Sequence, residues 1–390
     1  MALSPLGCVN VAGMVRTEMK KTKLLIFVTE DWVFCSHRLS LGEAAVQAGF
    51  EVLLVTRVRN HAKFIENVGI RIINLEHYRG RLNLILELWV LLKLCWIYKT
   101  ERPDLVHHVA LKPVLYGSLV ASLMRIRQIN AITGLGWIFI SNSKIARILG
   151  RFLELVLRYT LSGSICILQN PDDVKWIEKL QMKNPSIRLI PGAGIDIQKF
   201  HQKNKIVSDG LVVMLLSRML YDKGVVEFVE AARLLREKGQ KARFVLVGNP
   251  DLENRGSVSL TKLEEWQRDG LVEWWGHSDD VAGCYNQAAI ACLPSYREGL
   301  PKSLLEAAAC GLPIVTTDVP GCREVVNHED NGLLVPVKSS HALADALERL
   351  LIDPALRDRM GKRSREIAEN EFDVEHVITK TLEVYRELSA

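Results

Sequence analysis

Two carboxylates in the last third of the chain have the type and spacing to bind hydroxyl groups. Glu298 ends a short polar stretch, and Glu306 follows eight residues later inside the apolar run Leu304–Leu312. A carboxylate accepts hydrogen bonds from neighbouring hydroxyls, so we expect Glu298 to hold a sugar and Glu306 to hold a ribose. The alternative is an ordinary acidic first turn of a helix, which does not account for a glutamate within an apolar run.

The turn between these carboxylates is suited to binding an anion. It follows the apolar run Ile290–Leu293, typical of a buried strand, and precedes a stretch typical of a helix. Gly299, Leu300 and Pro301 form this turn, with the positive end of the helix behind them. Because helix ends of this kind bind phosphate groups, we expect these three residues to line a diphosphate site.

Two cations stand at a similar position earlier in the chain. Arg218 comes just after the apolar run Leu211–Leu216, and Lys223 lies five residues later, before an expected helix. Fixed cations stabilise the negative charge that develops on a departing diphosphate without a metal ion. A solvated turn explains the pair equally well in isolation. Beside the Glu298 turn, however, we expect Arg218, Lys223 and Glu298 to act in catalysis.

These residues need a fold that brings distant turns to one place. Short apolar runs alternate with helical patterns from Lys23–Thr29 onward, which predicts an α/β protein with parallel sheets. Ligands of doubly wound sheets bind beyond the carboxyl ends of the strands. Two such domains facing each other would therefore share a cleft.

A polar stretch over residues 198–210 interrupts the alternation and predicts a linker. The predicted organisation has four parts: a disordered tail (1–22), a first Rossmann-like domain (23–195), a second Rossmann-like domain (205–372) and a C-terminal helix packing back towards the first domain (373–390).

Net charge divides the chain into unlike halves. Residues 1–190 carry 25 Lys and Arg against 14 Asp and Glu, a net charge of +11, whereas the rest carries 25 against 31, a net charge of −6. A basic half favours an anionic partner, and membrane lipid, nucleic acid and a phosphorylated acceptor all fit. The eight cysteines include no CxxC pair, which favours reduced thiols over a zinc site.

The motifs together resemble one enzyme family. Glu298 and Glu306 match the E-x7-E motif of the family 4 retaining glycosyltransferases, and Arg218 and Lys223 resemble the phosphate-binding cations of that family. The segments SRMLYDKGVVEFVEAARLL and LPSYREGLPKSLLEAAACGLPIVTTDVPGCREVV are most similar to bacterial N-acetylgalactosaminyltransferases that act on polyprenyl-diphosphate-linked sugars. The resemblance covers nearly the whole chain after residue 22 and is most specific in the second domain.

The resemblance implies the GT-B fold, in which two doubly wound domains face a cleft. It implies a UDP-sugar donor bound by the second domain, retention at the anomeric carbon, and neither a cofactor nor a required metal. The implied acceptor is a lipid-diphosphate-linked sugar bound by the first domain. The implied process is the synthesis of an O-antigen, capsule or N-glycan, with N-acetylgalactosamine or another N-acetylhexosamine as the transferred sugar.

The residues after the first strand are expected to meet this acceptor. Residues 30–38 are expected to form an aromatic-rich loop, which in the similar branch ends in a basic residue. We expect Arg38 with His37 to bind the acceptor diphosphate; a surface salt bridge for Arg38 and a cap or core position for His37 are the alternatives. Gly134 and Gly136 permit close backbone approach to a ligand, so we expect them at the acceptor site unless their turn is purely structural.

Membrane contact is expected without a membrane span. No run reaches about 18 uncharged apolar residues, so no transmembrane helix is predicted. The predicted helices over Leu82–Leu94 and Val114–Arg127 join apolar faces to basic residues, as in helices that lie on anionic bilayers; ordinary core helices are the alternative. We therefore expect a cytoplasmic protein bound to the anionic inner face of the plasma membrane, with no nucleic acid partner.

Other functions fit less well. An NAD-dependent oxidoreductase would need a G-x-G-x-x-G turn after Lys23–Thr29, where Glu30, Asp31 and Trp32 stand instead. A non-catalytic sugar-nucleotide-binding protein would not need the intact set of Glu298, Glu306, Arg218 and Lys223. An epimerase or a phosphorylase of the GT-B fold is a further alternative, and only a transferase would release UDP in strict dependence on an acceptor. A family 4 transferase with Gal, Glc or Man as donor sugar, or with a soluble acceptor, stays open.

Overall fold

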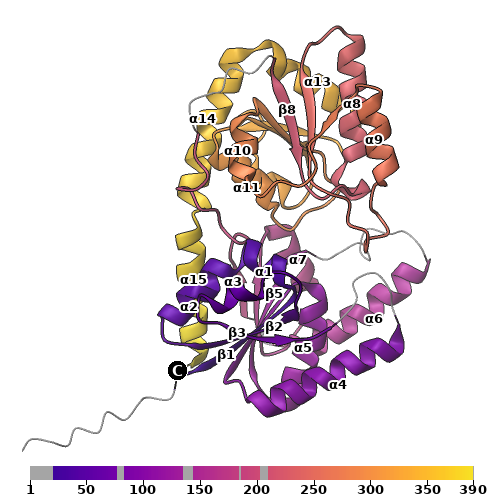
Figure 1. Ribbon diagram of the computed structural model, residues 1–390. Coiled ribbons are helices and arrows are strands. Elements are labelled where there is room, and N and C mark those ends of the chain that lie inside the picture. The colour runs from indigo at the N-terminus through magenta and orange to yellow at the C-terminus, as the bar shows by residue number, and fades with distance from the viewer. Residues whose placement is uncertain (1–20, 77–82, 135–143, 184–185, 203–209, 390) are drawn as a thin grey trace, which may run out of the picture.

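The computed structural model describes residues 21–76, 83–134, 144–183, 186–202 and 210–389, without the side chains of residues 84, 144–149 and 152. Within these ranges the chain forms two parallel sheets with helices on both faces, one sheet in each of two domains (Figure 1). The expected α/β class is confirmed. The tail expected at 1–22 lies outside the described residues as far as residue 20.

The first sheet has seven strands in the described part of the chain, in the order β3-β2-β1-β4-β5-β6-β7. Its central strands are apolar on both faces, as expected where helices cover both sides; Leu24, Leu25 and Ile26 of β1 are each at most 1 % exposed. The strands are β1 (Lys23–Glu30), β2 (Glu51–Arg57), β3 (Arg71–Asn74), β4 (Leu105–Val109), β5 (Arg127–Ile132), β6 (Ile165–Leu168) and β7 (Ser186–Leu189).

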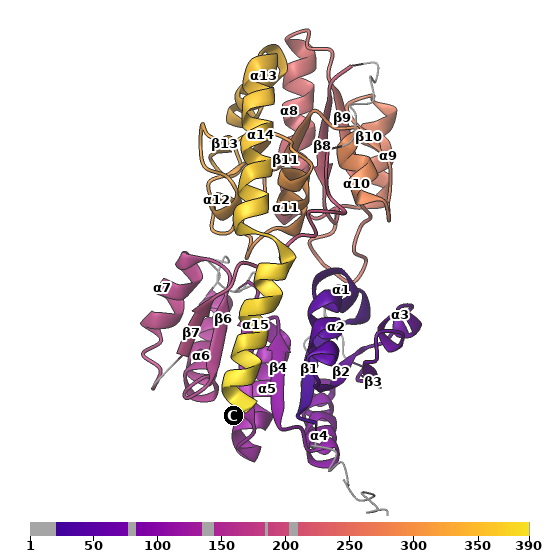
Figure 2. The ribbon, with the colours of Figure 1, turned by 90° about the vertical axis from the view of Figure 1, so that its left-hand side faces the viewer.

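Helices from two distant parts of the chain cover this sheet. Alternate β1 residues point to opposite sides: Leu25 and Phe27 pack with α4 and α5, whereas Leu24 and Ile26 pack with α2 and the C-terminal helix α15 (Figure 2). The helices are α1 (Asp31–His37), α2 (Leu39–Gln47), α3 (Ala62–Glu66), α4 (Leu84–Glu101), α5 (Leu111–Met124), α6 (Lys144–Thr160), α7 (Pro171–Lys179) and α15 (Val374–Ser389).

The segment after β1 differs from its prediction. Residues 30–38 are not a loop: α1 is helical from Asp31 to His37, and α2 begins at Leu39. The buried carboxylate of Asp31 accepts hydrogen bonds from three backbone amides at 2.7–3.0 Å, and this fixes the chain where β1 ends. Phe34 of the same helix is 0 % exposed, so an apolar anchor and a buried carboxylate together specify the extra helix.

The second domain repeats the plan with six described strands in the order β10-β9-β8-β11-β12-β13. The strands are β8 (Val212–Leu216), β9 (Arg243–Val247), β10 (Glu273–Trp274), β11 (Ile290–Leu293), β12 (Ile314–Thr317) and β13 (Gly332–Val335). The helices are α8 (Val225–Glu237), α9 (Leu260–Arg268), α10 (Val281–Asn286), α11 (Lys302–Ala309), α12 (Cys322–Val325), α13 (Ser340–Ile352) and α14 (Pro354–Glu371), with a 3-10 turn at Tyr221–Lys223.

The chain crosses between the domains twice, and the two crossings are bonded to each other. The amide of Ile195 donates to the carbonyl of Phe372 at 2.8 Å, and the amide of Val374 donates back to Ile195 at 3.0 Å. Gly194 permits this contact, because a Cβ there would lie 2.6 Å from the Cα of Val374. After the second crossing, α15 runs down the side of the first domain (Figures 1 and 2).

Both sheets start at their centre, so each has a point where the strand order reverses. In the first sheet it lies between β1 and β4, and in the second between β8 and β11. Loops diverge at such a point and leave a crevice at the carboxyl ends of the strands. The predicted functional turns follow β1, β8 and β11, so the fold places them at the two crevices.

Candidate active site

A cavity of about 880 Å³ lies between the domains, at the carboxyl ends of β1, β8, β9 and β11. It gathers most of the predicted site residues from positions far apart in the chain. Those that line it are His37 and Arg38 from the first domain, and Arg218, Lys223, Glu298, Gly299, Leu300, Pro301 and Glu306 from the second.

Glu298 is held in place by two donors. Its Oε1 atom accepts hydrogen bonds from Lys223 Nζ and, at 2.6 Å, from the hydroxyl of Ser295. The two turns can meet because Gly224 has no side chain; a Cβ there would lie 2.1 Å from the carbonyl oxygen of Pro294. The carboxylate side chain is 11 % exposed, so it faces the cavity as a fixed acceptor with a cation beside it.

Arg218 has a carboxylate partner that the sequence did not reveal. Its Nη1 atom lies 2.6 Å from Asp251 Oδ2, in the loop after β9, and its side chain is 43 % exposed. A half-exposed guanidinium beside a carboxylate can turn to an anionic ligand without losing a fully buried ion pair. Arg218 and Lys223 therefore present two cations to one part of the cavity.

Glu306 lies on the second turn of α11, deeper than Glu298. It is 7 % exposed, and burial raises the pKa of its carboxyl above the ordinary value while the nearby Lys302 acts in the opposite direction. Lys302 Nζ lies 3.5 Å from Glu306 Oε1 and also donates to the carbonyl of Ser36 in the first domain. The helix begins at Lys302, so Leu300 and Pro301 belong to the turn before it.

Arg38 brings a buried positive charge to the first-domain side of the cavity. It is 5 % exposed, and its one hydrogen bond within the described residues goes from Nη1 to the carbonyl of Gly192 at 3.3 Å. Its Nε atom has no partner there. A buried guanidinium that has no carboxylate partner lowers the stability of the fold unless it binds an anion. This position is therefore suited to an anionic ligand.

His37, beside it, keeps an exposed side chain at the edge of the cavity. Desolvation, together with the charges of Lys302 and Arg38, lowers the pKa of His37 to about 3. It can therefore donate and accept hydrogen bonds, but it adds no charge to the site.

The two predicted glycines differ in what the structure shows of them. Gly134 follows β5 with a φ of +149°, and a Cβ there would lie 4.0 Å from the amide nitrogen of Gly299. It thus lies against the turn that precedes α11, while its neighbour Thr133 lines the cavity. Gly136 lies outside the described residues.

Three charged residues in the cavity wall escaped the sequence analysis. Arg57 Nε donates to Glu30 Oε2 at 3.0 Å, and Arg57 Nη2 donates across the cleft to Glu253 Oε2 at 2.8 Å. Glu30 and Arg57 end β1 and β2, so the rule that ligands bind at the carboxyl ends of strands could have drawn attention to them. Their pairing with the second domain could not be deduced from the order of residues.

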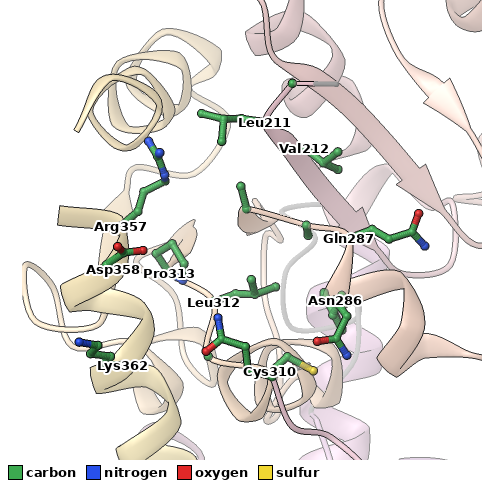
Figure 3. A pocket seen from close by; sticks show the side chains of 16 residues that line it. Leu211, Val212, Asn286, Gln287, Cys310, Leu312, Pro313, Arg357, Asp358 and Lys362 are labelled. Atoms are coloured by element: carbon green, nitrogen blue, oxygen red, sulfur yellow. The ribbon is translucent and has the colours of Figure 1, made fainter. Parts of the chain in front are cut away.

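A second cavity, of about 420 Å³, lies at the amino ends of β8 and β12, remote from all the predicted residues (Figure 3). Arg357 in its wall donates to the carbonyls of Leu350 and Leu351 at 2.6 and 3.0 Å, so this cation maintains the fold. Because doubly wound sheets bind ligands at the opposite ends of their strands, we assign the active site to the larger cavity.

Comparison with known proteins agrees with this geometry. The family model of glycosyl transferases group 1 matches residues 196–367, and that of glycosyl transferase 4-like proteins matches residues 23–171. The chain is 30 % identical over 351 residues to the N,N'-diacetylbacillosaminyl-diphospho-undecaprenol alpha-1,3-N-acetylgalactosaminyltransferase of Campylobacter jejuni, covering 86 % of this chain and 90 % of that protein. It is 27 % identical to the UDP-Gal:alpha-D-GlcNAc-diphosphoundecaprenol alpha-1,3-galactosyltransferase of Escherichia coli, over 78 % of this chain and 80 % of that protein.

Solved structures show the same architecture. A sucrose-phosphate synthase from Thermosynechococcus elongatus superposes with a TM-score of 0.78 at 22 % identity, covering 94 % of this chain and 99 % of that one. The Anabaena protein HepE in complex with UDP-glucose superposes with a TM-score of 0.73 at 17 % identity, again over 94 % and 99 %. With two facing doubly wound domains, a charged cleft at their switch points and these relatives, the chain belongs to the group 1, family 4-like glycosyltransferases of the GT-B fold.

Proposed function

We propose that this glycosyltransferase moves a sugar from a UDP-sugar to a polyprenyl-diphosphate-linked saccharide, with retention at the anomeric carbon. The observation that carries the proposal is one cavity in which two carboxylates and two cations of the second domain face a buried cation of the first. The names of the C. jejuni and E. coli relatives support the lipid-linked acceptor, and HepE with UDP-glucose supports the donor class. The C. jejuni relative favours N-acetylgalactosamine or another N-acetylhexosamine, used in O-antigen, capsule or N-glycan synthesis.

The donor would lie along the second-domain wall. Glu306 accepts hydrogen bonds from the ribose hydroxyls, and Glu298 accepts them from the transferred sugar. Arg218 turns from Asp251 to the diphosphate, and Lys223 meets the diphosphate while it stays beside Glu298; the diphosphate also meets the Gly299–Pro301 turn and the amino end of α11. This arrangement places every charge of the donor opposite a group of the right sign.

Catalysis would then rest on stabilising the leaving group. As the bond between the anomeric carbon and UDP loosens, the acceptor hydroxyl attacks from the same face and its proton passes to the departing phosphate oxygen. Arg218, Lys223 and the end of α11 stabilise the negative charge on UDP, so the reaction needs no metal ion. The sugar passes through an oxocarbenium-like state, close to the carboxylate of Glu298.

The acceptor would enter from the first domain. Arg38 offers its buried charge to the acceptor diphosphate, and His37 offers a neutral hydrogen-bonding ring. We also propose that Gly134 and Gly136 lie near the bound acceptor, because Thr133, just before them in the chain, lines the same cavity. A diphosphate at Arg38 would supply the negative charge that this residue lacks among its neighbours.

A lipid-linked acceptor requires that the enzyme reach a membrane surface. No helix in the described residues is long and apolar enough to cross a bilayer. However, α4 is apolar on two opposite sides: one side packs in the core, while the other exposes a stripe at helical spacing. We define this α4 stripe as Ile85 (79 % exposed), Leu88 (57 %), Trp89 (46 %), Leu92 (61 %) and Trp96 (63 %).

We propose that the α4 stripe inserts into the headgroup region of the anionic inner leaflet and that the net charge of +11 in residues 1–190 strengthens the contact. The protein would then be cytoplasmic and peripheral. The membrane contact expected for the helix over Val114–Arg127 stays a prediction. Its counterpart α5 buries Val114, Val120 and Ala121, because this face packs on strands β1, β4 and β5.

The test is nucleotide release from purified protein. UDP-GalNAc, UDP-GlcNAc, UDP-Gal, UDP-Glc and GDP-Man are each supplied with and without a lipid-diphosphate sugar. We expect release that requires both the acceptor and one UDP-sugar, and we expect it to survive excess EDTA. Release without an acceptor would contradict the transferase assignment, and loss of activity restored by Mg²⁺ or Mn²⁺ would contradict metal independence.

A further inference from the structure

The two residues that flank Glu298 are both bonded to the first domain. Arg297 Nη2 donates to Asp173 Oδ1 at 2.9 Å, and Asn170 Nδ2 donates to the carbonyl oxygen of Gly299 at 2.9 Å. Asn170 and Asp173 lie at the start of α7, on the opposite side of the cleft from the donor wall. The first domain therefore holds the side chain before Glu298 and the carbonyl after it, while the amide of Glu298 itself donates to the carbonyl of Pro320 in the second domain at 3.3 Å.

The first-domain part of this contact is rigid and buried. Asn170 caps α7 by accepting a hydrogen bond from the amide of Asp173 at 2.8 Å, and its side-chain nitrogen donates to Asp173 Oδ2 at 2.9 Å. Both residues are at most 1 % exposed. Burial raises the pKa of the Asp173 carboxyl, while the hydrogen bond from Asn170 and the charge of Arg297 favour its ionised form.

Gly299 is enclosed from both domains. A Cβ on Gly299 would lie 2.1 Å from the carbonyl oxygen of Thr133 and 2.8 Å from Oε1 of Gln169, both in the first domain. On the other side, a Cβ on Gly321 would lie 2.4 Å from the carbonyl oxygen of Gly299. The peptide after Glu298 therefore has no room to change its orientation while the domains are together.

We propose that Asp173 and Asn170 are positioning residues for Glu298, so that the donor-sugar site is completed by the acceptor domain. This inference rests on the proposed function and goes one step beyond it. UDP would depend mainly on the second domain, because none of Glu306, Arg218 and Lys223 has a hydrogen bond to α7 in the described residues; of the groups proposed for the diphosphate, the Gly299 turn is the one bonded to Asn170. The transferred sugar would need both domains: Lys223 and Ser295 hold the carboxylate of Glu298 from within the second domain, and the contacts of Arg297 and Gly299 across the cleft hold the segment that carries it.

A neighbouring ion pair offers a matched control. Arg323 Nη1 lies 3.0 Å from Asp172 Oδ2, also across the cleft, but these side chains are 39 % and 33 % exposed. The Asp173 and Arg297 side chains are 1 % and 24 % exposed. Exposed pairs contribute little, whereas removing one partner of a buried pair leaves an uncompensated charge. A variant of Asp172 therefore reports how much a contact between the domains contributes in general, whereas a variant of Asp173 also reports the positioning of Glu298.

The experiment compares Asp173→Asn, Arg297→Gln and the control Asp172→Asn. For each, calorimetry gives the affinity for UDP, and steady-state assays give kcat/KM for the UDP-sugar that the wild type uses best. We expect Asp173→Asn and Arg297→Gln to lower kcat/KM roughly 10- to 100-fold, as misplacement of a reacting group does. Their UDP affinity should stay within about twofold, and Asp172→Asn should stay within about threefold in both measurements. Arg297→Lys should recover part of the loss.

A double variant tests whether Asp173 affects activity through Glu298. If Asp173 acts through Glu298, adding Asp173→Asn to Glu298→Ala should lower activity by less than about twofold more. Independent losses that multiply, a wild-type kcat/KM in both Asp173→Asn and Arg297→Gln, or an equal loss of UDP affinity would each overturn the inference. Should Asp173→Asn fail to fold, Arg297→Gln alone decides the question. A wild type that turns over no sugar nucleotide would instead refute the proposed function.

Discussion

Glu298 and Glu306 belong to one motif, but their surroundings suit them to different parts of a donor. Glu306 is 7 % exposed within α11, whereas Glu298 faces the cavity beside Lys223. If Glu306 holds the ribose, Glu306→Ala should weaken free UDP roughly tenfold, because two hydroxyls lose a charged acceptor. Glu298→Ala should leave UDP affinity nearly unchanged and weaken the intact UDP-sugar. Calorimetry with both ligands checks this, and the opposite pattern would mean that the two roles are exchanged.

The two cations of the donor wall should act mainly on the rate. Arg218→Ala and Lys223→Ala should each lower kcat roughly 10²- to 10³-fold, since one fixed group facing developing charge is worth about 2–4 kcal/mol. Lys238→Ala is the matched control, because this lysine pairs with Asp345 and Glu348 on the surface of the second domain, outside the cavity wall. Steady-state kinetics with saturating acceptor measures the effect. Wild-type turnover in both active-site variants would refute the assignment.

Residue chemistry made part of this cavity predictable. Glu306 stands out as a charge within an apolar run, and Arg218 stands out after a buried strand, so their types alone pointed to function. Arg57 and Asp173 could not be found in this way. Each is an ordinary charged residue in sequence, and although the place of Arg57 at the end of β2 is a hint, the partner of each lies in the other domain, 196 positions away for Arg57 and 124 for Asp173.

At the level of elements, α4 carries the prediction of membrane binding. The protein should float with liposomes that contain about 30 % anionic lipid and bind neutral liposomes more weakly, because each basic residue near the surface adds about 1 kcal/mol. High salt should release part of the protein, because screening removes the electrostatic contribution to membrane binding and leaves the contribution from insertion of the α4 stripe. Flotation at low and high salt measures the two contributions.

Variants of the α4 stripe distinguish insertion of this helix into the bilayer from non-specific hydrophobic binding of the protein to liposomes. Replacing Trp89 and Trp96 with Ser should lower binding at high salt at least tenfold, because two large exposed rings are lost from the stripe. Ile352→Ser is the control, as this residue is 65 % exposed on α13 of the second domain. Equal flotation of the α4 variant and the wild type would exclude α4 as the contact.

Most strands and helices followed from the alternation of apolar runs, with ends displaced by a few residues. The short helices α1, α3 and α12 did not. The helix α1 escaped prediction because its anchor, the carboxylate of Asp31, binds amides of residues 59 and 61, which lie far along the chain. The membrane contact expected for α5 stays a prediction: Val114, Val120 and Ala121 are buried while Leu123 is 68 % exposed, and the pattern of one helix does not tell which of its apolar residues the sheet covers.

For the whole molecule, buried histidines predict a loss of stability in acid. His108 of β4 donates from Nδ1 to Asn130 at 2.7 Å, accepts from the Tyr98 hydroxyl at 2.8 Å through Nε2, and is 0 % exposed. Burial lowers the pKa of His108 to about 4, with the hydrogen bond to Asn130 acting in the opposite direction. The unfolded chain therefore binds a proton that the folded chain does not, and stability is complete above about pH 6.5 and falls as the pH approaches 4.

Between pH 7 and pH 4.5 this single histidine should lower the free energy of unfolding by on the order of 2 kcal/mol. Denaturant unfolding at several pH values, followed by circular dichroism, measures the slope. His108→Phe should be less stable at every pH, because Asn130 and Tyr98 lose a partner, but its slope should be shallower. An unchanged slope would show that other groups account for the acid sensitivity.

The return of α15 to the first domain has a consequence for biosynthesis. This helix contributes four residues to the hydrophobic core that also contains residues of β1 and α2: Val377, Ile378, Leu382 and Tyr385. The domain that is translated first is thus the last to be completed. At about 5–20 residues per second, roughly 10–40 s separate the emergence of β7 from that of α15 on the ribosome. During that interval one apolar face of a nearly finished sheet stays uncovered, and productive folding depends on its being shielded from other chains until α15 has been synthesised.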